Sequence, residues 1–123
     1  MSNGTILITD DEPHMRRLIG FTLRATGQRV LQANSGEAAI EIISREPIDL
    51  LIIDYAMDGI NGLETIAVLR KMERGAKLPI ILITARGDTG IRASAESEGI
   101  SAFITKPFSP VELTALVKQL LAA

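Results

Sequence analysis

The sequence predicts one α/β domain built on a parallel β-sheet. Short apolar runs alternate with longer amphipathic segments, and this alternation repeats five times along the 123 residues. Strict alternation of strands and helices favours a parallel sheet with helices on both faces. A chain of this length fits a single domain, and its hydrophobic fraction of 46% supplies an ordinary core. We therefore expect residues 1–123 to form one doubly wound domain.

The predicted strands are short runs rich in aliphatic and β-branched residues. They are TILIT (5–9), RVLQA (29–33), DLLIID (49–54), PIILIT (79–84) and SAFIT (101–105). Continuous apolar runs of this length are typical of strands that are buried on both faces.

The predicted helices have apolar residues three or four positions apart. They span residues 13–26, 36–46, 62–73, 89–98 and 109–122. Ser35 and Ser109 are suitable N-caps, and Gly27 is suitable for ending the first helix. The fourth helix carries Ile91 but otherwise mainly small or charged residues. Since packing supplies most helical stability, we expect this helix to be the most easily displaced.

The composition excludes several classes of function. There is no cysteine, so disulfides and thiolate metal sites are excluded. The net charge of −2 gives no electrostatic reason to bind nucleic acid directly. No apolar run can span a bilayer, and the N-terminal segment lacks the basic region of a signal peptide. We expect a cytoplasmic protein that does not associate with membranes.

Polar side chains follow four of the five predicted strands. In open parallel sheets, ligands bind beyond the carboxyl ends of the strands. The polar residues at these ends are Asp10, Asp11, Glu12, Asp54, Thr84, Arg86, Thr105 and Lys106. Each has an ordinary structural explanation when taken alone, such as a helix cap for the acidic pair. Their joint occurrence at one edge of the sheet favours a functional site.

The balance of charge indicates what this edge binds. Neighbouring carboxylates repel by roughly 4 kcal/mol per pair at an effective dielectric constant near 20, and Lys106 cannot offset three of them. Oxygen ligands with an open shell suit Mg²⁺, which is usually held by one or two carboxylates plus a phosphate. Asp54 can then act as a nucleophile that takes a phosphoryl group. Mg²⁺ and Lys106 would neutralise the phosphoryl oxygens, and the hydroxyl of Thr84 could donate to one of them.

Four motifs carrying these residues together resemble the receiver domain of two-component response regulators, including the chemotaxis regulators. The motifs are ITDDEP, LLIIDYAMDGINGLE, PIILITARGD and AFITKPF, and they follow the family's order over essentially the whole chain. The resemblance implies a flavodoxin-like fold with strand order 2-1-3-4-5 and five flanking helices. It also implies a signalling switch rather than an enzyme. The phosphoryl donor would be a histidine kinase or a histidine phosphotransfer protein.

The resemblance assigns the phosphorylation chemistry to matching positions. Asp54 would be the phosphoacceptor. Asp11, Asp54 and the backbone carbonyl of Ala56 would ligate Mg²⁺, with Asp10 acting through water. Ala56 and Arg86 match the positions that modulate how fast the phosphoryl group is lost.

The resemblance also assigns the response to phosphorylation. Lys106 would contact the phosphoryl group, and its peptide bond to Pro107 is expected to be cis. Thr84 and Phe103 would be the switch pair, which changes the surface formed by the fourth helix, fifth strand and fifth helix. A downstream partner, or an output domain absent from this chain, would read that surface. A dimer that forms on phosphorylation stays an open alternative.

Two positions depart from the common pattern of the family. Asp58 stands where a proline is usual, so we expect the loop after Asp54 to be more mobile and more negative. Phe103 lacks the hydroxyl of the tyrosine often found there.

In the family the first helix also meets the kinase, so Arg16 and Arg17, expected to be exposed charges, are candidates for that contact.

Three other functions stay open at this stage. An aspartate-nucleophile phosphatase commonly has a second carboxylate two residues after its nucleophile, where this chain has Ala56. A flavin-binding module would need a hydroxyl- and glycine-rich loop after the first strand, where this chain has DDEP. A degenerate receiver would lack some of the reactive residues, and all of them are present. The sequence does not distinguish a stand-alone regulator from one domain of a longer protein.

Overall fold

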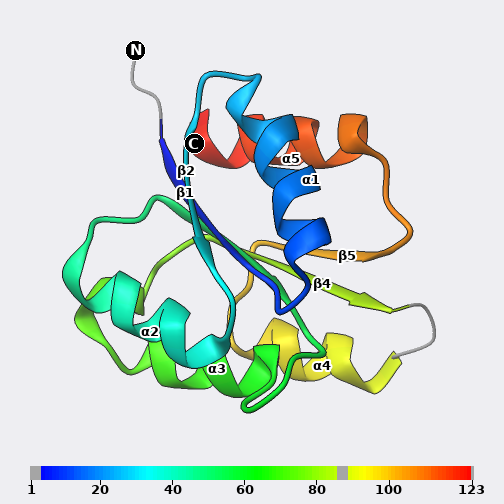
Figure 1. Ribbon diagram of the computed structural model, residues 1–123. Coiled ribbons are helices and arrows are strands. Elements are labelled where there is room, and N and C mark those ends of the chain that lie inside the picture. The colour runs from blue at the N-terminus through cyan, green and yellow to red at the C-terminus, as the bar shows by residue number, and fades with distance from the viewer. Residues whose placement is uncertain (1–3, 86–88, 123) are drawn as a thin grey trace.

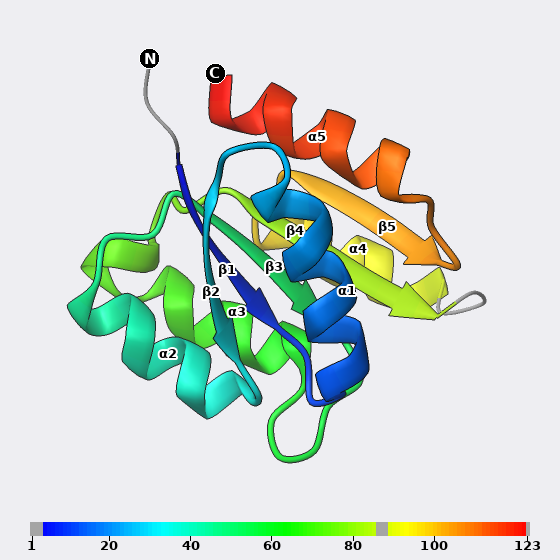
Figure 2. The same ribbon diagram turned by 45° about the horizontal axis from the view of Figure 1, so that its top comes forward.

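The computed structural model describes residues 4–85 and 89–122. Its elements, in chain order, are β1 (Thr5–Thr9), α1 (Pro13–Arg24), β2 (Arg29–Ala33), α2 (Gly36–Arg45), β3 (Leu50–Asp54), α3 (Gly62–Arg70), a 3₁₀ turn (Glu73–Gly75), β4 (Ile80–Ala85), α4 (Thr89–Ser97), β5 (Ala102–Lys106) and α5 (Pro110–Ala122). The strands form one parallel sheet in the order β2-β1-β3-β4-β5, as Figure 2 shows. This confirms the predicted fold class and strand order.

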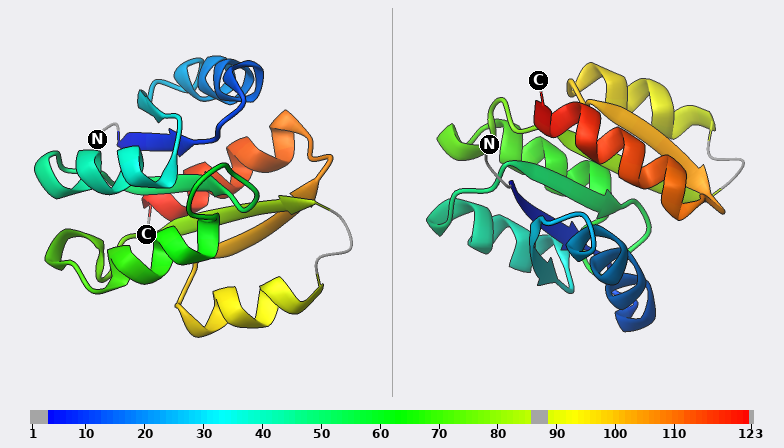
Figure 3. Two further views of the ribbon diagram at one scale, coloured as in Figure 1. Left: turned by 60° about the horizontal axis from the view of Figure 1, so that its bottom comes forward. Right: turned by 90° about the horizontal axis from the view of Figure 1, so that it is seen from above.

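Helices cover both faces of the sheet. Helices α1 and α5 lie on one face, and α2, α3 and α4 lie on the other (Figure 1). Alternate strand residues enter different cores: Leu50 and Ile52 pack with α1 and α5, whereas Leu51 and Ile53 pack with α2, α3 and α4. Because all the strands are parallel, their carboxyl ends, which carry the polar residues, lie at one end of the molecule (Figure 3, left).

Side-chain caps fix the starts of several helices. The hydroxyl of Ser35 accepts the Ala38 N–H at 3.0 Å, and the hydroxyl of Ser109 accepts the Glu112 N–H at 3.0 Å, as predicted. Helix α3 begins with a reciprocal capping box that the sequence analysis did not identify. There the Asn61 side chain accepts the Glu64 N–H, and the Glu64 side chain accepts the Asn61 N–H, both at 2.8 Å.

Helix α3 ends earlier than predicted because Arg70 closes a tight turn after it. The guanidinium of Arg70 donates to the carbonyl oxygens of Gly75 and Leu78, both at 2.8 Å. It also donates to the carbonyls of Glu98 at 2.8 Å and Gly99 at 3.0 Å, just after α4. Burial lowers the pKa of Arg70. One side chain thus ties α3, the approach to β4 and the end of α4 together.

Helix α4 has little apolar anchorage, as expected. Ala95 is its one fully buried residue among those whose burial the structure describes, and Ile91 is half-buried. The guanidinium carbon of Arg92 lies 5.2 Å from the centre of the Phe103 ring, which joins α4 to β5. No helix within residues 4–85 and 89–122 is long and apolar enough to cross a membrane.

Candidate functional site

Three charged residues continue the face of the sheet that α1 and α5 cover. Side chains alternate along a strand, so a residue faces the same side as the residue two positions before it. Asp10, Asp54 and Lys106 each follow by two positions a residue of the core between the sheet and these helices. Those residues are Ile8, Ile52 and Ile104. The pleat thus brings two carboxylates and an ammonium together at the carboxyl end of the sheet.

Asp54 and Lys106 form an ion pair at the centre of this edge. Lys106 Nζ lies 3.0 Å from Asp54 Oδ1, and Asp54 is only 5% exposed. Burial raises the pKa of Asp54, and the hydrogen bond and charge of Lys106 oppose this only in part. Burial lowers the pKa of Lys106, but Asp54, Asp10 and Glu12 outweigh this and raise it above its ordinary value. Lys106 therefore keeps its positive charge, and this charge only partly offsets the negative charge of the carboxylates around it.

Asp10 adds a second buried carboxylate to the site. It is 3% exposed, and burial raises its pKa to about 6 although the Glu12 N–H donates to its Oδ1 at 2.9 Å. Arg16 NH1 donates to the Asp10 carbonyl oxygen at 2.6 Å and Arg16 is half-buried, so the expectation that Arg16 is an exposed charge is wrong. Arg17 is exposed, as expected. Arg16 therefore has a structural role beside the site.

Asp11 and the loop after Asp54 form the outer side of the site. Asp11 is half-buried, and its Oδ2 accepts the backbone N–H of Asp58 at 3.0 Å. The loop closes where the Gly62 N–H donates to the Tyr55 carbonyl at 2.8 Å. A Cβ at Gly62 would lie 2.7 Å from the carbonyl oxygen of Asp54, so only glycine lets the chain return this closely.

Thr84 and Phe103 lie on the opposite face of the sheet from the ion pair. Phe103 pairs in register with Leu82, and both belong to the core beneath α2, α3 and α4. Thr84, two positions after Leu82, continues this face and is 1% exposed. The two predicted switch residues are therefore diagonal neighbours on one face of adjacent strands. Arg86 lies outside the residues that the structure describes.

The donor set fits an open Mg²⁺ site better than a metal site closed by protein ligands alone. Within residues 4–85 and 89–122, no three acidic or histidine side chains are grouped closely enough to hold a metal ion by themselves. Mg²⁺ commonly binds through one or two carboxylates and completes its shell with waters and phosphate oxygens. Two buried carboxylates with raised pKa values and an incompletely balanced charge are consistent with such an open site.

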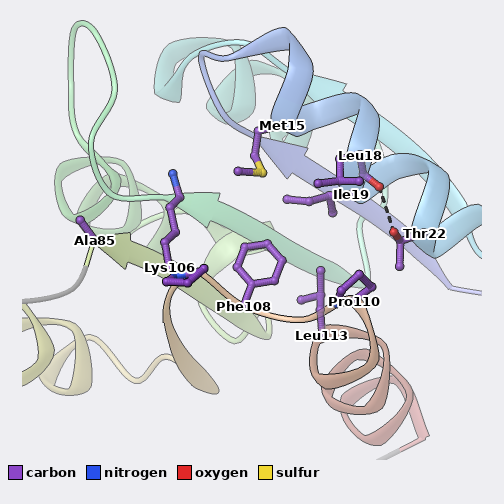
Figure 4. Close-up of a pocket in the computed structure, with 10 residues that line it drawn as sticks. Met15, Leu18, Ile19, Thr22, Ala85, Lys106, Phe108, Pro110 and Leu113 are labelled. Atoms are coloured by element: carbon purple, nitrogen blue, oxygen red, sulfur yellow. Dashed lines mark hydrogen bonds between the residues drawn. The ribbon is translucent and has the colours of Figure 1, made fainter.

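A pocket of about 490 Å³ opens beside Lys106, between α1 and the start of α5 (Figure 4). Its walls are mainly apolar and include Leu18 of α1 and Phe108 and Leu113 on the opposite side. Leu18 is 46% exposed and Phe21, on the same helix, is 74% exposed. An apolar surface thus adjoins the charged site.

The family model for the response regulator receiver domain matches residues 6–118. The chain belongs to this family. This receiver domain is 38% identical to the phosphate regulon transcriptional regulatory protein PhoB of Pseudomonas aeruginosa, over 98% of this chain and 53% of that protein. The chain therefore spans about half the length of that relative. Membership confirms the recognition made from the four motifs, and phosphorylation and Mg²⁺ binding are typical of the family.

Solved structures agree with this assignment. A crystal structure described as a response regulator from Chloroflexus aurantiacus has a TM-score of 0.92 and 34% identity, covering 99% of this chain and all of that one (100%). The receiver domain of a sensor histidine kinase from Pseudomonas aeruginosa has a TM-score of 0.89 and 26% identity, covering 99% and 100%. That structure has a magnesium ion coordinated in its active-site cleft.

The contacts of Arg70 and of the Asp58 backbone amide were not predicted from the sequence. A visible signal existed for each. Arg70 stands in the last turn of a helix, where cations favour the free carbonyl groups. Asp58 replaces the family's usual proline and so adds an N–H donor to the loop. In both cases the signal did not identify the acceptor: Asp11 lies 47 residues before Asp58, and the carbonyls that accept from Arg70 lie 5 to 29 residues after it.

Proposed function

We propose that this receiver domain is a phosphorylation-dependent signalling switch in which Asp54 accepts a phosphoryl group. The observation that supports this most directly is the 3.0 Å contact between Lys106 Nζ and a buried, incompletely neutralised Asp54 carboxylate. The chain would act as a phosphoacceptor rather than as an enzyme with turnover on a separate substrate. All of residues 1–123 would serve as one receiver domain.

The reaction transfers a phosphoryl group from a phosphohistidine to Asp54. A carboxylate oxygen of Asp54 attacks phosphorus, an O–P bond forms, and the P–N bond breaks with its electron pair left on the imidazole. The ammonium of Lys106 stands beside the carboxylate and is placed to neutralise phosphoryl oxygens. Thr84 would donate its hydroxyl to one of these oxygens. Hydrolysis of the product would be modulated at Ala56, which is exposed beside the site, and at Arg86.

Mg²⁺ fits this site as the cofactor, and when bound it would stabilise negative charge on the phosphoryl oxygens. Asp11, Asp54 and the backbone carbonyl of Ala56 would hold it, with Asp10 contributing through water. The raised pKa values of Asp10 and Asp54 support this assignment, because the buried carboxylates lack enough cationic partners within the described structure.

The response would spread across the sheet to α4. Thr84 would move toward the phosphoryl group, and Phe103, its diagonal neighbour on the same face, would turn inward. The contact between Arg92 and the Phe103 ring would then change, and with it the surface formed by α4, β5 and α5. A partner protein, an output domain or a second copy of the chain would read this surface.

The phosphoryl donor would be a histidine kinase or a histidine phosphotransfer protein in the cytoplasm. The apolar pocket beside Lys106 and the exposed Leu18 and Phe21 of α1 supply a surface against which such a donor can pack. Arg17 is exposed on the same helix and available for ionic contact. The donor's histidine would then face the carboxyl edge of the sheet.

The decisive experiment is intact-mass measurement after incubation with acetyl phosphate, with and without Mg²⁺. We expect one phosphoryl group on the wild-type chain, none on Asp54→Asn, and normal uptake by Asp49→Asn, which removes a charge from the other end of β3. The gain should require Mg²⁺. No gain under conditions that label another receiver would favour a degenerate receiver regulated by binding alone. Repeated hydrolysis of simple phosphate esters would favour the phosphatase instead.

A further inference from the structure

We propose that the backbone amide of Asp58 positions the carboxylate of Asp11 for binding Mg²⁺. This inference rests on the proposed function, since it assigns Asp11 to the metal. Its direct evidence is the hydrogen bond from the Asp58 N–H to Asp11 Oδ2, at 3.0 Å across 47 residues of sequence. A hydrogen bond from an amide to an ionised carboxylate is stronger than a hydrogen bond between neutral groups.

The donor exists because of the residue that occupies position 58. The family usually has proline there, and proline has no N–H to donate. In this chain, any residue other than proline would supply the amide, so the side chain of Asp58 is not what makes the contact. Aspartate in place of the family's usual proline therefore has two separable effects: it adds a backbone donor, and it adds a nearby negative charge.

The loop that presents this amide is fixed at both ends. The Tyr55 N–H donates to the Ile83 carbonyl at 2.8 Å, and the Gly62 N–H donates to the Tyr55 carbonyl at 2.8 Å. The capping box between Asn61 and Glu64 secures the start of α3 directly after the loop. The amide of Asp58 is thus a donor on a closed loop, and it restricts that loop. The expectation that Asp58 makes the loop more mobile stays a prediction, which this hydrogen bond opposes.

The hydrogen bond leaves Asp11 suited to bind a cation. It engages Oδ2, and Oδ1 remains as the second oxygen of the same carboxylate. A carboxylate whose orientation is already fixed loses less rotational freedom when it binds a metal. Outer hydrogen bonds to metal ligands typically change metal affinity by about 10- to 100-fold. Since Asp11 is only half-buried and otherwise free to rotate toward water, we expect the lower end of that range.

Three substitutions at position 58 test the proposal. Asp58→Asn and Asp58→Ala keep the backbone donor and remove the charge, whereas Asp58→Pro removes both. Mg²⁺ affinity is measured by titration followed by NMR chemical shifts on the unphosphorylated protein. We expect Asp58→Asn and Asp58→Ala to bind Mg²⁺ within about 2- to 3-fold of wild type, and Asp58→Pro to bind about 10-fold more weakly than Asp58→Ala.

A second measurement does not require the proline variant to fold. Hydrogen exchange of the Asp58 amide is compared between the wild-type chain and Asp11→Ala without metal, with exchange of the Gly62 amide as the internal control. We expect the Asp58 amide to exchange about 10-fold faster in Asp11→Ala, because its acceptor is gone, and the Gly62 amide to be unchanged.

The outcomes separate this inference from the proposed function. Equal Mg²⁺ affinity in Asp58→Pro and Asp58→Ala, or an Asp58 amide indifferent to Asp11→Ala, would overturn the positioning role while leaving phosphorylation of Asp54 intact. Failure of the wild-type chain to bind Mg²⁺ would instead remove the metal from the proposed function and this inference with it. Weaker binding confined to the proline variant would support it.

Discussion

Lys106 and Arg70 are half-buried cations with different kinds of partner. Lys106, at the carboxyl end of β5, pairs at 3.0 Å with the Asp54 carboxylate. Arg70, at the end of α3, donates to four backbone carbonyls just before β4 and β5. The charge of a carboxylate changes when it binds a proton, a metal or a phosphoryl group. Backbone carbonyls undergo no such change of charge. The environment of Lys106 can therefore change when a proton or ligand binds, whereas that of Arg70 stays constant.

Helix α4 connects these two regions. It begins at Thr89, shortly after the carboxyl end of β4, and ends at Ser97, next to the carbonyls that Arg70 holds. Its centre is anchored by Ala95 and by the Arg92 contact with Phe103. A helix held at its C-terminal end is expected to move mainly at its N-terminal end, which follows the carboxyl end of β4. The weak helix predicted from sequence is thus secured at one end.

Removal of Arg70 should have the largest effect on stability. Arg70→Ala removes the guanidinium donor from four backbone carbonyls, and we expect a loss of about 3 kcal/mol in the free energy of unfolding. Urea denaturation measures it, with Arg74→Ala, an exposed arginine of the nearby 3₁₀ turn, as control. Phosphoryl uptake by the folded variant should persist. Equal stability of the two variants would refute the structural role of Arg70.

Protonation of Asp10 should produce the next largest effect. Its pKa is raised from 3.8 to about 6, so the folded state binds a proton that the unfolded state releases. Unfolding free energy should therefore fall as pH rises from about 4 to about 6. Asp10→Asn should flatten this slope and be more stable above pH 7 by about 2 kcal/mol. Added Mg²⁺ should reduce the difference in unfolding free energy between Asp10→Asn and the wild-type chain. An unchanged slope in Asp10→Asn would show that burial does not destabilise the ionised form of Asp10.

Substitution of Lys106 should have a smaller effect that depends on pH. Lys106→Met leaves the Asp54 carboxylate buried without its cation, which should cost about 1–2 kcal/mol of stability at pH 8. Loss of the cation raises the pKa of Asp54 further, so its protonation should reduce the cost at pH 5. The effect of Arg70→Ala should not vary over this range. The same pH dependence in both variants would break the contrast between the two cations.

Arg92 should contribute least to stability. Its side chain is 62% exposed, and it makes one helical ion pair with Glu96 at 3.4 Å and one contact with the Phe103 ring. We expect Arg92→Ala to cost less than about 1 kcal/mol. Hydrogen exchange should nevertheless accelerate in the first turns of α4 and not near Ser97, where Arg70 holds the chain. Uniform acceleration along α4 would argue against the fixed C-terminal end.

The sequence predicted every strand and α-helix of the described fold, because local patterns decide them. Alternation of apolar runs gave the α/β class, and Ser35 and Ser109 marked true N-caps. The end of α3 was misplaced because Arg70 acts through carbonyls that follow later in the chain. Helical periodicity continues past that point and contains no information about such a turn.

The candidate site was predictable to the extent that topology determines it. Strand ends of a parallel sheet meet at one edge, so the proximity of Asp10, Asp54 and Lys106 followed from their positions. Distances and pKa shifts did not, since they depend on burial. The bond between Asp58 and Asp11 also did not, because it joins a backbone donor to a side chain across two loops. The roles of these residues in phosphorylation stay predictions.

Among residues 4–85 and 89–122, the sheet also divides the apolar interior into two cores that share no buried side chain. Phe103 and α4 belong to one core, and Phe108, α1 and α5 belong to the other. Protein engineers could therefore recombine the two halves of the interior independently. The α1–α5 core of another receiver could be transplanted with the packing around Phe103 left in place, which would test the proposed role of α1 in donor binding.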